Sequence, residues 1–520
     1  MSNYQVQRVD YHNQDAAKID FRLWLQDYRE GQGRDLRYFV QTFGCQQNEA
    51  DSEKMRGILE DLGLQEGTAY EEADLVLINT CSIRENADQR LFGHLGELKA
   101  LRTRHPQLKV AVCGCLPTQA PQNAKIRESF SFVNLLMGPQ DIQRLPELLL
   151  AIFRDEQKLN AVTKTNVVAE GLPIMRERKF RALVSIMYGC NNFCSYCMVP
   201  SARERERSRL AADILAECRE LAAQGIPEVM LLGQNVNAWG FDLFAPEKRE
   251  LRPLSFGETE IKKLQALRAG ELGPEAIHSF PQLLAALGSI PGLQSIRFMS
   301  PHPRDFAGEM LAALQVVPEI ANHVHLPVQS GSDRVLKAMN RHYNRDRYLA
   351  IVEGLRQVRP GISITTDIMV GFPGETEEDF QDTLNLVEEA RFSSAFSFIY
   401  SPRPGTPAAT WVQIEEELKH QRFDRLLAVL NRLSLAEHKA MLASERRILL
   451  EGVSKGDPLV LTGRDSEFHL INIRIPADLT LPAEAYSSPG QLSPSYFEGK
   501  FVQARITAAK TFSLEAELLG

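Results

Sequence analysis

The stretch Tyr188-Gly-Cys190-Asn-Asn-Phe-Cys194-Ser-Tyr-Cys197 decides how the rest of the chain is interpreted. Its three cysteines lie within eight residues and are separated by three and then two others. A four-iron cluster usually takes four cysteine thiolates, so a cluster held here would keep one iron open to a small molecule. A zinc site or a disulfide pair is the alternative. Structural zinc takes four ligands, and no fourth cysteine or histidine follows at short range.

The segments around these cysteines predict a barrel. The run 182–187 is apolar and is typical of a buried strand, so the cysteines would follow a strand's carboxyl end, where barrel enzymes place their chemistry. Strand-like and helix-like segments alternate from 176 to 409. Besides 182–187, strands are predicted at 229–232, 295–298, 323–326, 363–370 and 395–400. We expect an incomplete (β/α)6 barrel, open on one side to a large substrate.

A second group of cysteines follows predicted strands nearer the N-terminus. Between 36 and 153 strands and helices alternate, which indicates an open parallel α/β sheet. Ligands of such sheets bind at the carboxyl ends of the strands, and neighbouring strands lie only about 4.8 Å apart. Three strands lead into Cys45, Cys81 and Cys115, so the fold should gather these thiols at one edge. Cys113 is a rival for Cys115, on the same face but one layer deeper.

Composition narrows the class of protein. A chain of 520 residues suggests about three domains. No apolar run approaches the ~18–20 residues of a membrane span, and the N-terminus lacks the apolar region of a signal peptide. Eight cysteines are too sparse for a disulfide scaffold, and their clustering indicates metal binding in a reducing cytoplasm. The net charge of −8 argues against a broad nucleic-acid surface, so an RNA site would be a local basic patch.

The CxxxCxxC loop, with Tyr196 just before its last cysteine, resembles the radical S-adenosylmethionine (SAM) enzymes. In that family the open iron binds SAM, and an electron from the cluster cleaves SAM to methionine and a 5′-deoxyadenosyl radical. The continuation 198–209 resembles the methylthiotransferases, most closely the tRNA-modifying MiaB type. The segments 42–48, 79–85 and 114–115 resemble that family's N-terminal domain, which holds an auxiliary cluster.

The resemblance implies two [4Fe-4S] clusters and a SAM pocket. Cys190, Cys194 and Cys197 would hold the radical SAM cluster. Cys45, Cys81 and Cys115 would hold the auxiliary cluster, which leaves Cys113 in the core. Polar segments at 233–237, 327–332 and 367–375 resemble the SAM pocket, and their candidate SAM contacts are Gln234, Gln329, Ser330 and Asp367. Among the arginines that follow the loop, we expect Arg203 to orient the SAM carboxylate, and the others to share this role or form surface ion pairs.

The remaining segments flank these two units. Residues 1–35 look like an extension ahead of the first domain, and 154–175 look like a polar linker. The stretch 242–279 looks inserted and contains an amphipathic helix, which is either a lid or an ornament. A long helix from 415 to 447 would link domains, and 440–520 should form a small β-barrel. That barrel resembles the TRAM domain, an RNA-binding module.

The family resemblance implies a tRNA methylthiotransferase. It would add a methylthio group to ring carbon 2 of N6-isopentenyladenosine at position 37, next to the anticodon. We expect a cytoplasmic monomer without membrane contact that uses a sulfur source and an electron donor such as flavodoxin or ferredoxin. The alternatives within the family are threonylcarbamoyladenosine in tRNA and an aspartate of a ribosomal protein. A non-catalytic iron–sulfur RNA-binding protein is the alternative from another class.

Overall fold

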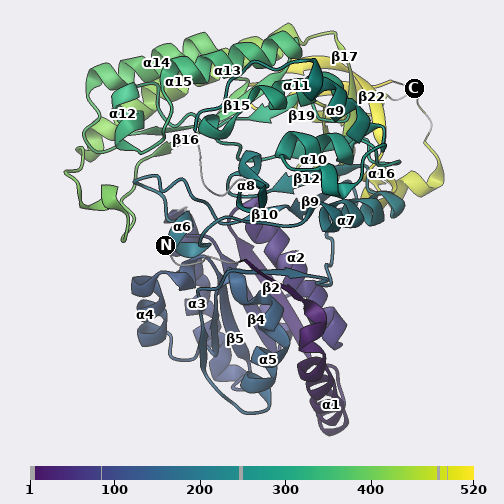
Figure 1. The fold of residues 1–520 in the computed structure, drawn as a ribbon. Helices are drawn as coiled ribbons and strands as arrows, with labels where there is room; N and C mark the ends of the chain where they lie inside the picture. Colours follow the sequence, from purple (N-terminus) through teal and green to yellow (C-terminus); the bar gives the residue numbers. More distant parts are fainter. Residues whose placement is uncertain are drawn as a thin grey trace.

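The computed structural model describes residues 6–82, 85–244, 250–476, 479, 481–488 and 490–519. An N-terminal α/β domain lies below a central barrel in Figure 1, and a C-terminal β-barrel packs on the far side of the central one. Helix α2 (Gln46–Leu62) lies at the junction of the first two units. No described helix combines the length and apolar character needed to cross a membrane.

The N-terminal domain is a six-stranded parallel sheet covered by helices on both faces, as the sequence predicts. The strand order is β3 (Gln65–Glu66), β2 (Arg37–Phe43), β4 (Leu75–Thr80), β5 (Lys109–Gly114), β6 (Leu135–Met137) and β7 (Leu159–Ala161). Alternate residues of β4 enter opposite cores: Leu75 and Leu77 pack with α2 and α5 (Leu145–Phe153). Val76 and Ile78 pack with α3 (Glu85–Arg104) and α4 (Ala120–Ser129).

Two segments flank the N-terminal domain. The N-terminal extension contains α1 (Asp15–Gln32), whose Phe21 and Leu25 are fully buried in the first domain's core. The expected linker at 154–175 instead contributes β7 to the sheet and β8 (Val167–Glu170), which pairs in parallel with β1 (Gln7–Asp10). Strands this short have too few residues to show a period, so the sequence pattern did not distinguish them from loops.

The central unit is the expected partial barrel. Its strands, all parallel and in sequence order, form two sheets of three: β9 (Arg181–Ser185), β12 (Glu228–Leu232), β13 (Ser295–Phe298), then β14 (His323–His325), β15 (Ser363–Val370), β16 (Ser394–Ile399). Backbone hydrogen bonds from Ile296 N to Glu319 O at 2.7 Å and from Ala321 N to Ile296 O at 3.0 Å join the two sheets. Strands β9 and β16 form the two edges, so the barrel is open between them.

Helices form the outer layer of the barrel. They are α7 (Ala211–Ala223), α10 (Phe280–Leu287), α11 (Gly308–Val316), α13 (Arg345–Val358), α14 (Glu377–Ala390) and α15 (Glu416–Ala440). The inserted helix α9 (Glu258–Arg268) packs on α10 and α11 through the buried Leu264 and Leu267. It therefore belongs to the outer layer and is not a lid over the cysteine loop, which lies near α6 (Val199–Ala202) in Figure 1.

The C-terminal unit is the expected small β-barrel. It closes in the order β17 (Glu445–Val453), β18 (Val460–Arg464), β19 (Leu470–Arg474), β23 (Leu514–Leu518), β22 (Phe501–Ala509). Phe468 docks it on the central barrel, because its ring lies 5.2 Å from the guanidinium of Arg181 and 4.7 Å from that of Arg297. The remaining short elements are α8 (Phe241–Phe244), α12 (Asp333–Ala338), α16 (Pro494–Phe497), β20 (Tyr486–Ser488) and β21 (Gln491–Leu492).

Candidate metal centres

The first candidate centre lies at the carboxyl edge of the N-terminal sheet. The last paired positions of β2, β4 and β5 are Phe43, Thr80 and Gly114, which lie side by side. The hydrogen-bond ladder continues past them, since Cys81 N donates to Phe43 O at 2.8 Å and Cys115 N donates to Thr80 O at 2.9 Å. The sheet therefore places the cysteines that follow neighbouring strands at one edge, as the sequence predicts.

The thiols of this set interact with one another. Gly44 has φ of 156°, and a Cβ added there would lie only 2.8 Å from the Cβ of Cys81, which shows how closely the two loops approach. A hydrogen bond from Cys81 is the main cause that lowers the pKa of Cys45 to about 6. A thiol with that pKa is largely thiolate at neutral pH, which is the form that binds metal. Cys115 joins the set electrostatically, because a charge on Cys45 raises its pKa beyond the effect of burial.

Cys113 lies elsewhere. It is 1% exposed and packs in the core formed with Leu75 and Leu135, on the α2 side of the sheet. Burial alone raises its pKa to about 12. The structure thus separates the two rival cysteines as the sequence analysis expected.

The second candidate centre is a loop closed at its base by a short ladder. Strand β10 (Met187–Tyr188) pairs antiparallel with β11 (Arg207–Ser208), so residues 189–206 form the loop. Within it, Cys190 N donates to Glu204 O at 3.1 Å. Gly189 has φ of 76°, and a Cβ there would overlap the carbonyl group of Arg205. Only glycine suits a left-handed backbone packed this closely.

The three thiols of this loop interact electrostatically. Burial is the main cause that raises the pKa of Cys190, and charges on Cys197 and Cys194 raise it further. Burial and then the charge of Cys194 raise the pKa of Cys197 to about 12. Thiols that destabilise one another's charge in this way lose their protons when a metal binds. Each set offers three mutually close sulfur ligands, so both sets fit a [4Fe-4S] cluster with one iron open.

Arg341 braces the second centre, and the sequence analysis missed it. Its guanidinium is buried, with Nη1 3.4 Å from the Sγ of Cys194 and 3.5 Å from the hydroxyl of Tyr196. Nη2 donates to the carbonyl of Pro327 at 3.1 Å. A single arginine after a short helix gives no sequence signal that separates it from a surface charge. Only the tertiary fold brings it under the cysteine loop.

The predicted SAM contacts occupy three places. Gln234 Oε1 accepts a hydrogen bond from Gly189 N at 2.5 Å, so this side chain supports the cysteine loop. Gln329, with φ of 72°, donates its N–H to Asp367 O at 2.8 Å, and the Asp367 carboxylate lies 3.4 Å from Nε2 of His325. Ser330 is fully buried, with its hydroxyl 3.3 Å from that of Thr383. Their contacts with SAM remain predictions.

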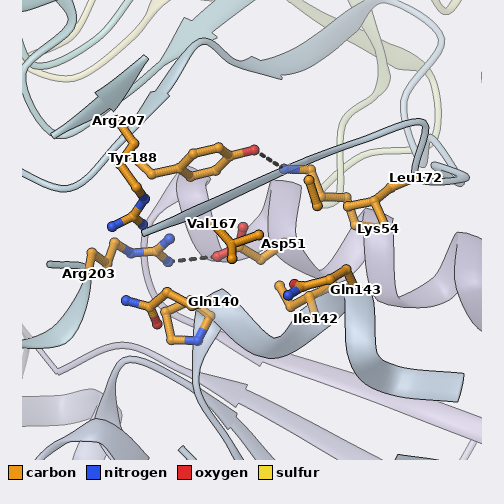
Figure 2. A pocket seen from close by; sticks show the side chains of 12 residues that line it. Asp51, Lys54, Gln140, Ile142, Gln143, Val167, Leu172, Tyr188, Arg203 and Arg207 are labelled. Carbon is orange, nitrogen blue, oxygen red and sulfur yellow. Dashed lines mark hydrogen bonds and ion pairs between the residues drawn. The ribbon is translucent and has the colours of Figure 1, made fainter. Parts of the chain in front are cut away.

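Arg203 lies against the other centre. Its Nε donates to the Sγ of Cys115 at 3.2 Å. Its Nη2 pairs with the Oδ2 of Asp51 at 2.7 Å, as Figure 2 shows. These contacts connect Arg203 to the N-terminal domain, and its contact with the SAM carboxylate stays a prediction. Arg209, expected among SAM contacts or surface pairs, is buried between Glu170 and Glu217 at 2.7 and 2.6 Å.

Two family models match parts of this chain. Residues 184–387 match the Radical SAM superfamily, and 37–138 match the family described as "Uncharacterized protein family UPF0004". The solved structure of the radical SAM methyltransferase TsrM from Kitasatospora setae covers 72% of this chain and 75% of its own, at 16% identity and a TM-score of 0.49.

The sequence relatives decide the assignment. The tRNA-2-methylthio-N(6)-dimethylallyladenosine synthase of Caldicellulosiruptor saccharolyticus is 40% identical over 91% of this chain and 94% of its own length. The protein of the same name from Desulforamulus reducens is 41% identical over 93% of this chain and 95% of its own. This chain therefore belongs to the tRNA-2-methylthio-N(6)-dimethylallyladenosine synthase family of radical SAM proteins.

Proposed function

We propose that this chain adds a methylthio group to ring carbon 2 of N6-isopentenyladenosine at position 37 of tRNA. The observation that carries the proposal is the pair of three-cysteine sets, each gathered at a strand's carboxyl end in one of two abutting domains. The carbon–hydrogen bond at that position is unactivated, so acid–base chemistry cannot replace it. The names of the relatives support this substrate.

The two [4Fe-4S] clusters and SAM would supply the radical chemistry and the sulfur. The chain's own contribution is to hold them. Cys190, Cys194 and Cys197 bind from a loop that Gln234 and Arg341 fix in place. Cys45, Cys81 and Cys115 bind from the edge of a rigid sheet. Two cysteines of each set are buried, Cys81 and Cys115 in one and Cys190 and Cys194 in the other, which limits the access of water.

Helix α2 holds the two sites in a fixed relation. It begins immediately after Cys45, and it packs on β9, the strand that leads into the Cys190 loop. Gln47 Nε2 donates to the hydroxyl of Ser185 at 2.8 Å, and Ala50 packs with Leu183 in the barrel interior. Preorganised sites of this kind do not have to be assembled during the reaction.

The partners follow from the same proposal. A reductant of the flavodoxin or ferredoxin class delivers electrons, a separate source delivers sulfur, and the C-terminal β-barrel contacts the tRNA as a TRAM-like module. The chain acts as a cytoplasmic monomer. Gln329, Ser330 and Asp367 serve SAM at the ends of the later barrel strands, and Gln234 acts through the cysteine loop that it supports.

The decisive experiment supplies the anaerobically reconstituted chain with SAM, dithionite and tRNA that carries either isopentenyladenosine or unmodified adenosine at position 37. Mass spectrometry of the digested tRNA should show the methylthio nucleoside only from the isopentenylated substrate. Cys218→Ala is the matched control, because Cys218 lies in the barrel's apolar core. Absence of both the product and 5′-deoxyadenosine would indicate a binding protein. If the chain instead methylthiolates threonylcarbamoyladenosine or a ribosomal-protein aspartate, that molecule is the substrate and the proposed one is wrong.

A further inference from the structure

Arg203 connects the two centres. It lies six residues after Cys197 in the sequence, yet its guanidinium hydrogen-bonds Cys115 and Asp51 of the N-terminal domain. Its side chain is 5% exposed. Figure 2 shows the guanidinium directed at Asp51, beside a cavity of about 40 Å³ that Lys54 and Tyr188 also line. The cavity has room for a few water molecules only.

We propose that Arg203 is a positioning residue that raises the reduction potential of the auxiliary cluster, by donating a hydrogen bond to the sulfur of Cys115 and placing a positive charge beside it. This inference rests on the auxiliary cluster of the proposed function. Hydrogen bonds to the sulfurs and nearby charge are the means by which proteins tune iron–sulfur potentials. Reduction adds a negative charge to the cluster, and a buried cation stabilises that charge with little screening by water.

The backbone that carries Arg203 is fixed from two directions. Arg203 N donates to Val199 O at 2.8 Å, which makes the residue the continuation of α6. Gln140 of the N-terminal domain donates to Ala202 O at 3.3 Å and clamps the same turn. The end of the radical loop is thereby anchored on the auxiliary edge, so its orientation survives small side-chain changes.

Asp51 carries a negative charge that opposes the effect of Arg203 on the cluster. Its carboxylate accepts from Arg203 and from Gln47 Nε2, which lies 3.3 Å from Oδ1. The guanidinium of arginine stays protonated in proteins, and the Oδ2 of Asp51 lies 2.7 Å from the Nη2 of Arg203. The arginine therefore stays charged, and Asp51 partly offsets its field at the cluster. Removal of the Asp51 charge should therefore raise the reduction potential of the auxiliary cluster, whereas removal of the Arg203 charge should lower it.

The test measures the potential of the auxiliary cluster alone. Every variant is made in the full chain with Cys190, Cys194 and Cys197 replaced by alanine, and reconstituted anaerobically. Electron paramagnetic resonance follows a redox titration. Arg203→Met should lower the ratio of reduced to oxidised cluster about tenfold at a fixed potential, which is about 59 mV for a one-electron couple. Arg203→Lys, which keeps the charge, should lower it less. Asp51→Asn should raise it.

Arg209→Met is the matched control, since Arg209 is also buried and pairs with Glu170 and Glu217 rather than with a candidate ligand. Its ratio of reduced to oxidised auxiliary cluster should equal that of the protein that carries only the three cysteine-to-alanine replacements. An unchanged ratio in Arg203→Met with about four irons bound would overturn the inference. If Arg203→Met binds no iron, the test rests on Asp51→Asn. An unchanged or lower ratio of reduced to oxidised cluster in Asp51→Asn then refutes the inference. A background protein that binds no iron would instead refute the auxiliary cluster of the proposed function.

Discussion

The backbone N–H of Cys115 donates to the carbonyl of Thr80 at 2.9 Å, one residue beyond the last paired position of β5 and β4. Cys113 is still within β5, paired with Asn79, and its side chain enters the apolar core. A difference of two residues along one strand thus separates a candidate ligand from a core side chain. Cys113 and Cys115 form a natural pair for testing the auxiliary site.

Cys113→Ala should retain about eight irons per chain after anaerobic reconstitution, the content of two four-iron clusters, and Cys115→Ala should retain about four. The first change removes a buried thiol that touches only core atoms, whereas the second removes a ligand. Iron and sulfide analysis measures both. The reverse pattern would assign the ligand to Cys113. If the unmodified chain holds about four irons and loss of Cys115 does not lower that number, the chain has no auxiliary cluster.

Arg341→Met should weaken the radical SAM loop while sparing the auxiliary set. The substitution deletes buried donors to Pro327 O and to the Sγ of Cys194. Because Pro327 O keeps the hydrogen bond from the hydroxyl of Tyr343 at 3.3 Å, the cost is about 1 kcal/mol for each hydrogen bond lost. We expect incomplete iron loading of the loop and slower release of 5′-deoxyadenosine from SAM.

Arg345→Met is the control for that variant. Arg345 pairs with the largely exposed Glu389 at 2.6 Å, and such pairs contribute ~0–1 kcal/mol. Full iron content and normal SAM cleavage in Arg341→Met would show that the loop holds its shape without the arginine.

The docking of the C-terminal barrel should depend on pH through His469. Burial lowers the pKa of its imidazole, but the hydrogen bond with Asp465 at 2.9 Å and the ion pair with Glu437 at 3.8 Å outweigh burial and raise the pKa to about 9. A pKa raised above the unfolded value of 6.5 stabilises the fold fully below that pH, and the contribution is lost as pH rises through 9. Asp465 has a lowered pKa, so its own contribution is lost only in acid.

His469→Gln should therefore lower the melting temperature more at about pH 6 than at about pH 10. The full contribution of the charged imidazole is on the order of 3 kcal/mol, because its pKa rises from 6.5 to about 9 and each pKa unit corresponds to about 1.4 kcal/mol. Thermal unfolding of the two proteins across this range measures the difference. The exposed His12 provides a control substitution. An equal loss at both pH values would mean that the imidazole is neutral in the folded chain.

The sequence predicts the features that depend on a local residue pattern, and it does not predict contacts between distant segments. The strands at 295–298 and 363–370 coincide with β13 and β15, since each carries β-branched or aromatic residues and is bounded by Gly or Pro turn segments. The cysteine sets were predictable because each cysteine follows a strand. The partners of Arg203 and Arg341 depend on how distant segments pack, 152 and 147 residues away for Asp51 and Cys194. No local pattern carries that information, and a resemblance transfers a residue's identity more readily than its contacts.

The final prediction separates the two halves of the chemistry. Replacing Cys45, Cys81 and Cys115 together by alanine should leave SAM cleavage to 5′-deoxyadenosine largely intact, because the Cys190 loop is closed by its own ladder and braced by Arg341. The same variant should make no methylthio nucleoside, because nothing would present sulfur to the substrate. Replacing Cys190, Cys194 and Cys197 should abolish both, since radical formation precedes carbon–sulfur bond formation.

Chromatography of the nucleosides and of the SAM products measures both activities in one reaction, with Cys218→Ala as the control for loss of a buried thiol. The auxiliary variant must first show about four irons and the spectrum of one intact cluster. A methylthiolated tRNA from that variant would refute the sulfur-delivery role of the N-terminal set. Failure to cleave SAM despite a full radical cluster would mean that the first centre governs the second. Arg203 is the physical route for such coupling, because the segment that leaves the Cys197 loop ends in its hydrogen bond to Cys115.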